Sequence, residues 1–330
     1  MILLITTTGY SQYIQFSQYY ASPLNLAPSF AGTVSHSRIA MNYRDQWVKM
    51  SGVFRTYSLA ADMHVDKINS GFGILLAKDA AGTGNLGRFD AGVQYSWYGL
   101  INKTYQFYFR PGVAFKMSQR NLDFEKLIFG DQITPYGYLP YTSQARPKDV
   151  KKTYIDASAS VMFYNPSFWA GLNVEHLFHP ADAYYDPNYR IPYKYHFYAG
   201  YKFRLGPGGR YGHYNTSNIK DIFFVSTYFR LQSKQAQMDI GGYWNHDPLT
   251  FGIWVRGLPY MNIEHTVNVD AIIFLIGYKI YSFEIGYSYD MTISPLIAST
   301  GGSHEISLIY KFDPNLNPRK KEGPIPCPGF

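Results

Sequence analysis

The sequence has little cysteine, little charge and no long apolar run. Cys327 is the only cysteine among 330 residues, so the chain cannot form an internal disulfide. No window approaches the roughly 20 apolar residues that a spanning helix needs. Charged residues make up 16% of the chain, and the net charge of +7 is spread out rather than gathered in a basic stripe. These features disfavour a helical membrane protein and a nucleic-acid-binding protein.

Motifs for catalysis or metal binding are weak. His176 and His179 would lie on opposite faces of a strand, and we expect Glu175 to face inward while His176 faces outward or joins an aromatic girdle. The glycines of 206–212 lack the Lys-Ser/Thr of a phosphate loop. The adjacent Ser, His and Glu at 303–305 cannot meet as a triad. We therefore predict no enzyme, and no catalytic, cofactor or metal site.

Aromatic residues, by contrast, are abundant. They make up 18% of the chain, with 32 Tyr and 23 Phe, while apolar residues as a whole remain at an ordinary 46%. In a transmembrane β-barrel, lumen residues dilute the apolar ones and aromatic residues form girdles at both membrane interfaces. The composition fits such a barrel.

An alternation of apolar and polar residues indicates strands. In the hairpin at 281–312, for example, Phe283, Ile285 and Tyr287 alternate with Glu284 and other polar or small residues. Further strands are predicted around 39–44 and at 57–65, 72–79, 86–98, 105–118, 153–164, 168–178, 193–205, 222–231, 237–244, 250–257 and 267–278. The total is about fourteen, an even number as in bacterial single-chain barrels. We predict an all-β fold, a transmembrane antiparallel β-barrel over 35–312; the alternation alone would also fit a soluble sandwich.

The connections between strands differ in length. If the N-terminus is periplasmic, the extracellular loops include the long segments 119–150, 181–192, 258–266 and 291–303. The periplasmic turns are short, as at 165–167 and 246–249, with 206–218 as the exception. Long extracellular loops and short periplasmic turns are typical of outer-membrane barrels.

Charged residues of both signs are predicted to face the lumen. They are Arg44, Asp62, Asp90, Arg110, Lys116, Asp156, Glu175, Arg230, Arg256, Asp270, Glu284, Asp290 and Glu305. In a low-dielectric interior such charges must pair or be hydrated. A paired network would brace or plug the barrel and a hydrated one would line a channel; we favour bracing.

Tyrosines gather among prolines in two of the long loops. They are Tyr136, Tyr138, Tyr141, Tyr184, Tyr185, Tyr189 and Tyr193. Tyrosine offers a large amphipathic contact area, and stiff loops lose less entropy on binding. The loops are therefore candidate binding sites for a protein partner, although they could equally pack on each other as a lid.

Three segments lie outside the predicted barrel. The run at 1–11 is typical of a signal peptide without its basic n-region. Residues 12–34 form a Pro-containing, aromatic segment, which we place on the periplasmic side or in the lumen. Residues 313–330 form a basic, Pro-rich periplasmic tail with candidate docking residues for a partner, namely Arg319, Lys320, Lys321, Cys327 and Phe330.

Several strings resemble the PorP/SprF family of outer-membrane proteins, which works with the type IX secretion system of Bacteroidetes. They are FSQYYASPL, YRDQW, FWAGLNVEHL, the closing hairpin YSYDMTISPLIASTGGSHEISLIY and a basic tail ending in CPGF. The resemblance implies an outer-membrane barrel without a cofactor that binds the C-terminal domain of a secreted adhesin. It further implies a role in adhesin export and surface attachment, as in gliding motility, and contact with the periplasmic ring of the machinery. The alternatives are a passive, porin-like diffusion channel and a soluble sugar-binding protein.

Overall fold

The computed structural model describes residues 14–34, 37–138, 151–184, 188–205, 221–233, 235–258, 268–293 and 300–312. The predicted signal peptide at 1–11 and the tail at 313–330 lie outside these residues. Across the described ranges, no helix is both long enough and apolar enough to cross a membrane. The helices that do occur are short, beginning with α1 (Pro23–Leu26) and η1 (Pro28–Phe30).

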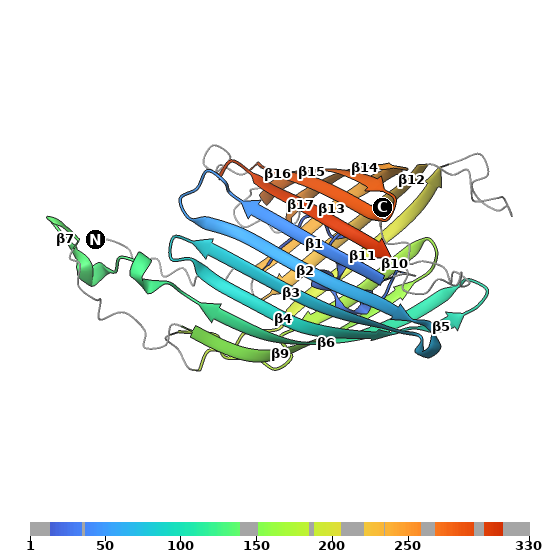
Figure 1. Cartoon of the computed structure of the whole chain (residues 1–330), viewed down its shortest axis with the longest axis horizontal. Helices are drawn as coiled ribbons and strands as arrows, with labels where there is room; N and C mark the ends of the chain where they lie inside the picture. Colours follow the sequence, from blue (N-terminus) through green and yellow to red (C-terminus); the bar gives the residue numbers. More distant parts are fainter. Residues whose placement is uncertain are drawn as a thin grey trace.

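Fourteen long antiparallel strands of the described chain close into a barrel (Figure 1). Going round the barrel, they are β1 (Ser37–Gln46), β2 (Val53–Val65), β3 (Ser70–Gly82), β4 (Leu86–Trp97), β6 (Phe107–Asn121), β9 (Lys151–Tyr164), β10 (Phe168–Glu175), β11 (Lys194–Leu205), β12 (Asp221–Gln232), β13 (Gln235–His246), β14 (Leu249–Leu258), β15 (Asn268–Ile280), β16 (Phe283–Thr292) and β17 (Ser303–Phe312). β1 pairs with β17 from Ser37↔Phe312 to Gln46↔Ser303, which closes the ring. The predicted barrel of about fourteen strands is confirmed.

Each strand of the barrel has one apolar and one polar face. In β16, Phe283 and Ile285 are 45% and 44% exposed, whereas Glu284 and Asp290 are buried. Most exposed side chains in the middle of the other strands are also apolar, as at Val93. Because backbone groups pair all the way round, the apolar faces form a continuous outer surface suited to lipid.

One end of the barrel carries most of the long connections, and we call it the loop-rich end. The connections there join β6 to β9, β10 to β11, β14 to β15 and β16 to β17. Before β9 the chain forms η3 (Phe124–Lys126), η4 (Gly130–Gln132) and the hairpin of β7 (Ile133–Thr134) with β8 (Gly137–Tyr138). Figure 1 shows β7 well beyond the barrel strands. At the opposite end the turns are short, apart from the connection between β11 and β12 and a stretch that forms η2 (Asp66–Ile68) and β5 (Gly99–Asn102).

Residues 14–34, which we call the plug, run through the lumen. Their first half bonds with residues of β16 and β17 near the loop-rich end, as in the contact of Ser17 with Glu305. Their last residues bond with β2, β4 and β6 near the opposite end, as in the contact of Arg110 with Ala31. Most of the plug is buried, so the interior of the barrel holds a packed core as well as polar side chains.

Candidate functional site

Glu305 binds the backbone of the plug near the loop-rich end. Its two carboxylate oxygens accept hydrogen bonds from the N–H groups of Ser17 at 2.7 Å and of Gln18 at 3.1 Å. The Gln18 side chain donates to Ser288 at 3.3 Å and accepts from Ser307 at 2.6 Å. All five side chains are fully or almost fully buried. Buried polar groups are stable only when hydrogen-bonded, so these bonds fix the position of the plug on β16 and β17.

Two arginines complete this cluster from other strands. Arg44 of β1 donates to Asp290 at 2.7 Å, to Glu305 at 3.2 Å and to the Ser17 hydroxyl at 2.8 Å. Arg256 of β14 donates to the same Asp290 oxygen at 2.9 Å and to the Ser17 hydroxyl at 3.1 Å. The network therefore joins four strands and the plug, and its charges are paired, which corresponds to the bracing that we favoured.

Two tyrosines of the plug enter an aromatic cluster on the wall. The ring of Tyr19 lies 4.9 Å from that of Tyr228 and 5.2 Å from that of Trp254, and the ring of Tyr20 lies 5.3 Å from that of Tyr243. Tilted and edge-on contacts at these distances are favourable beyond the burial of area. The plug is thus held by apolar packing as well as by charge.

The plug is also bound where it approaches β1. Arg110 donates to the carbonyl oxygens of Ala31 at 2.5 Å and of Gly32 at 2.9 Å. Asp62 accepts from the Gly32 N–H at 2.8 Å and also from Arg38 at 2.8 Å. Here too, side chains of the barrel wall bind backbone N–H and C=O groups of the plug. In a strand, such groups would be bonded to a neighbouring strand instead.

Close approach of the plug requires glycines on the wall. A Cβ atom added to Gly71 would collide with the Ala31 carbonyl, and one added to Gly112 would collide with the Ser29 backbone. Glycine allows such contact because it has no side chain. Ser29 also donates its N–H to Ser160 of β9 at 2.8 Å.

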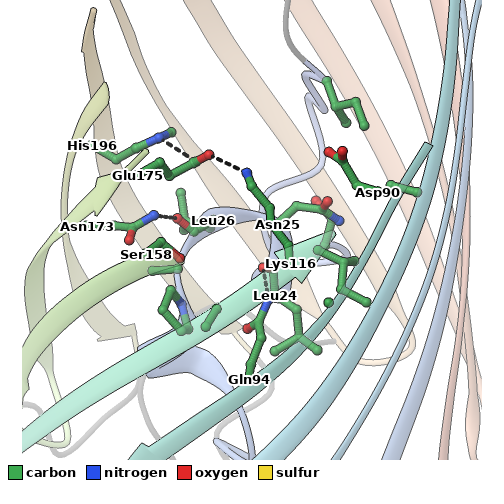
Figure 2. A pocket seen from close by; sticks show the side chains of 18 of the residues that line it. Leu24, Asn25, Leu26, Asp90, Gln94, Lys116, Ser158, Asn173, Glu175 and His196 are labelled. Atoms are coloured by element: carbon green, nitrogen blue, oxygen red, sulfur yellow. Dashed lines mark hydrogen bonds and ion pairs between the residues drawn. The ribbon is translucent and has the colours of Figure 1, made fainter. Parts of the chain in front are cut away.

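A cavity of about 100 Å³ lies between the plug and the wall strands β3 to β12 (Figure 2). Gln94 and Asn173 line it, and their amide N–H groups donate to the plug carbonyls of Leu24 at 2.8 Å and of Leu26 at 3.1 Å. The amide oxygens of both side chains have no hydrogen-bond partner within the described part of the chain. Both oxygens are fully buried, so they are enclosed by the packed lining and do not face open space.

Charged side chains surround the same cavity. Glu175 lies 3.1 Å from Lys116 and 2.8 Å from the Nε2 atom of His196, as Figure 2 shows. Arg88 and Asp90 form a second pair at 3.0 Å. The lining also contains Lys194 and Arg230. Behind this lining, Asp156 lies 4.0 Å from Lys116 and Asp239 lies 3.9 Å from Arg230, so these cations also have buried carboxylate partners.

His176 does not face outward, so that expectation is wrong. β10 ends at Glu175, and His176 takes a left-handed backbone conformation with φ of 65° that turns its ring inward. The ring is fully buried, with Nδ1 2.7 Å from an Asp156 oxygen. Strand alternation no longer applies once the strand has ended.

The other predicted lumen charges lie on the inner face, with one exception. Lys311 and Glu284 form an ion pair at 2.5 Å near the opposite end, and Glu284 is 1% exposed. Asp270 is exposed instead, where the register of β14 and β15 shifts between Arg256 and Gly257.

The tyrosines of the long loops have different surroundings. Tyr136 is 100% exposed, and Tyr189 and Tyr193 are 39% and 38% exposed. Tyr193 also packs on His179, with ring centroids 4.0 Å apart. Tyr138 is part of β8, whereas Tyr141 and Tyr185 lie outside the described residues, as do the tail residues Arg319, Lys320, Lys321, Cys327 and Phe330.

Tyr184 joins the two tyrosine-containing loops to each other. Its ring packs edge-on against Phe124 at 6.0 Å, and the guanidinium of Arg120 lies 5.8 Å from its centre. Arg120 also pairs with Asp182 at 2.5 Å. Burial raises the pKa of the Asp182 carboxyl, and Arg120 lowers it in part. Tyr184 therefore makes the loop-to-loop contact of the lid alternative, whereas Tyr136, Tyr189 and Tyr193 are exposed as the partner-binding alternative requires.

The sequence interpretation missed the polar residues of the plug and two residues of the cavity. Lys194 and His196 alternate with Tyr195 and Phe197 in β11, so the period-two pattern already placed them inward. Ser17 and Gln18 carried no such signal, because the plug is not a strand. Among the described residues, no three His, Cys, Asp or Glu side chains gather as a metal site would require.

Comparison with known proteins identifies the family. The family of type IX secretion system membrane proteins named PorP/SprF matches residues 8–310. The chain belongs to this family. It is a membrane β-barrel of a secretion-system family, and that family is not one of enzymes. No curated protein matches this PorP/SprF family member.

Solved structures of porins resemble the barrel. Two of them are a double mutant and a triple mutant of the Rhodopseudomonas blastica porin. In each case the sequence identity is 10%, the TM-score is 0.34, and the match covers 84% of this chain and 99% of the porin.

Proposed function

We propose that the protein is an outer-membrane barrel that binds the C-terminal domain of a secreted adhesin and helps its export and attachment to the cell surface, as in gliding motility. The observation that carries this proposal is the family match over residues 8–310. The apolar outer surface fits a membrane position, and the loop-rich end would face the cell exterior.

The exposed tyrosines at the loop-rich end support a binding role. Tyr136, Tyr189 and Tyr193 present large amphipathic side chains on the loops. The filled lumen also favours binding over the alternative of a diffusion channel, because the plug bonds with β17 and with β10, which lie on opposite sides of the barrel. In the proposed arrangement, cargo contacts the loops while the barrel serves as an anchor.

Co-purification from native membranes tests the proposal. A tagged chain should retain an adhesin or other secretion components at a stoichiometric level, and Tyr136→Ala combined with Tyr189→Ala should reduce the adhesin. The matched control is Tyr105→Ala, because Tyr105 is 73% exposed but lies at the opposite end. Recovery of no secretion component, or equal loss with the control, would contradict the proposal.

The basic tail at 313–330 is proposed to dock on periplasmic components, including the ring of the machinery. Its cluster of Arg319, Lys320 and Lys321 would attract an acidic partner surface. A chain that ends after β17 should still bind adhesin at the loops but should lose the periplasmic components in the same co-purification. Unchanged recovery of those components would remove the tail from the proposal.

A further inference from the structure

A groove of about 410 Å³ lies on the outer face of the barrel. It is lined by residues of β17 and of β1 to β4, which are neighbours in the wall (Figure 1). Its volume is within the range of about 300–1,000 Å³ that ligand sites occupy. Because this face of the barrel is the one suited to lipid, the groove opens toward the acyl chains of the membrane.

The lining of the groove is apolar toward the middle of the barrel and more polar toward the loop-rich end. The first row of residues, across β1, β2 and β3, consists of Met41, Leu59 and Leu76. The second row, two residues nearer to the loop-rich end in each strand, consists of Tyr43, Tyr57 and Lys78. A membrane lipid has the same order, with its chains in the membrane interior and its headgroup at the interface.

Lys78 is an exposed cation in an apolar setting. Its partners across the neighbouring strands are Tyr57 of β2 and Phe89 of β4. Among the residues that the structure describes, Lys78 makes no hydrogen bond and no ion pair. The other charged side chains on the outer face of these five strands, Arg55 and Asp45, pair with each other at 3.2 Å. The outer face here therefore carries one unbalanced positive charge, which is costly in lipid unless it meets an anionic headgroup.

We propose that the groove binds one acyl chain of an anionic membrane lipid and that Lys78 binds the phosphate of its headgroup. The Tyr57 hydroxyl makes no hydrogen bond within the described chain and can donate to the same phosphate. The acyl chain lies on the first row of the groove. This inference goes beyond adhesin binding and does not depend on it.

Charge favours a lipid over a second copy of the chain as the occupant. In a symmetric pair of barrels the same surface meets itself, so the two Lys78 side chains would lie in one apolar interface without a counter-ion. A phosphate headgroup supplies that counter-ion and leaves the groove to its acyl chain.

Native mass spectrometry of the detergent-purified barrel tests the site. The probes are phosphatidylglycerol and phosphatidylcholine with identical acyl chains, added in equal amounts, so that only the headgroup differs. We expect phosphatidylglycerol to be the first bound lipid about fivefold more often, which is the effect of one lysine near an anionic surface. Inorganic phosphate should not displace it, because phosphate has no acyl chain to fill the groove.

Variants place the binding in the groove. Lys78→Gln should remove the preference for phosphatidylglycerol, whereas Lys67→Gln, on the exposed η2 at the opposite end, should keep it. Leu59→Trp narrows the groove without altering charge and should lower the occupancy of both lipids. The matched control is Ile253→Trp, on the exposed outer face of β14, which should leave the occupancy unchanged.

Four results would overturn the site. They are equal binding of the two lipids to the unchanged chain, an undiminished preference in Lys78→Gln, displacement of the lipid by phosphate, and a dimer of the barrel that Leu59→Trp dissociates. The last result would make the groove an interface between copies of the chain. None of these results bears on adhesin co-purification, which tests the proposed function separately.

Discussion

Arg44→Met should destabilise the barrel far more than removal of a comparable surface arginine. The Arg44 side chain is 3% exposed and bonds with Asp290, Glu305 and Ser17. Breaking a buried ion pair by removing one partner typically costs about 3–5 kcal/mol. Asp290 would keep Arg256 at 2.9 Å, so we expect the lower part of that range, about 3 kcal/mol.

Arg55→Met is the matched control. Arg55 pairs with Asp45 at 3.2 Å, but the two side chains are 50% and 24% exposed. Exposed pairs contribute about 0–1 kcal/mol. The assay is urea unfolding in lipid vesicles, followed by tryptophan fluorescence, for both variants and the unchanged chain. If the free energy of unfolding of Arg44→Met lies within about 1 kcal/mol of that of Arg55→Met, the network does not hold the barrel as argued.

Three further predictions concern the lumen, the outer face and the loops. Gly112→Val should displace the plug and produce openings in planar-bilayer recordings, which Gly130→Val should not, since an added Cβ there meets nothing. Val93→Arg, on the outer face in the middle of β4, should lower the free energy of unfolding in lipid by about 2–4 kcal/mol. Asp182→Asn should weaken the pair with Arg120, and limited proteolysis should then cut the two loops several times faster.

A specific outcome would contradict each of these three predictions. A closed Gly112→Val barrel would mean that the plug tolerates a side chain at its closest contact. If Val93→Arg has the same free energy of unfolding as the unchanged chain, Val93 does not face lipid. The control is Ile133→Arg in the projecting β7, which should change the free energy of unfolding little. Unchanged proteolysis of Asp182→Asn would mean that the loops pack independently of that pair.

The barrel could be predicted because its strands repeat one simple rule. Side chains of Phe283 and Glu284 face opposite ways in any strand, so the pattern of residues alone distinguishes the outer face from the inner one. The even strand number follows from counting such segments. Lys194 and His196 obey the same rule, and a stricter reading of β11 would have placed them in the lumen.

The course of the plug and the inward orientation of His176 could not be predicted in the same way. The plug has no period, and its backbone is satisfied by side chains such as Glu305, which is 288 residues away from Ser17. Only the closed barrel brings them together. His176 depends on a left-handed backbone angle just after β10, and no residue pattern specifies such an angle for histidine.

The contact between Ser17 and Glu305 has a consequence for the order of assembly. The plug is made first, yet one of its main acceptors is on the last strand, so the contact cannot form until the whole barrel sequence has been synthesised. Non-local contacts of this kind form late, because the loop between them costs entropy to close. The backbone N–H groups of Ser17 and Gln18 therefore lack this partner until the C-terminal hairpin has been made, although later residues of the plug can already bind earlier strands. The bond to Glu305 thus requires that the last strand be in place.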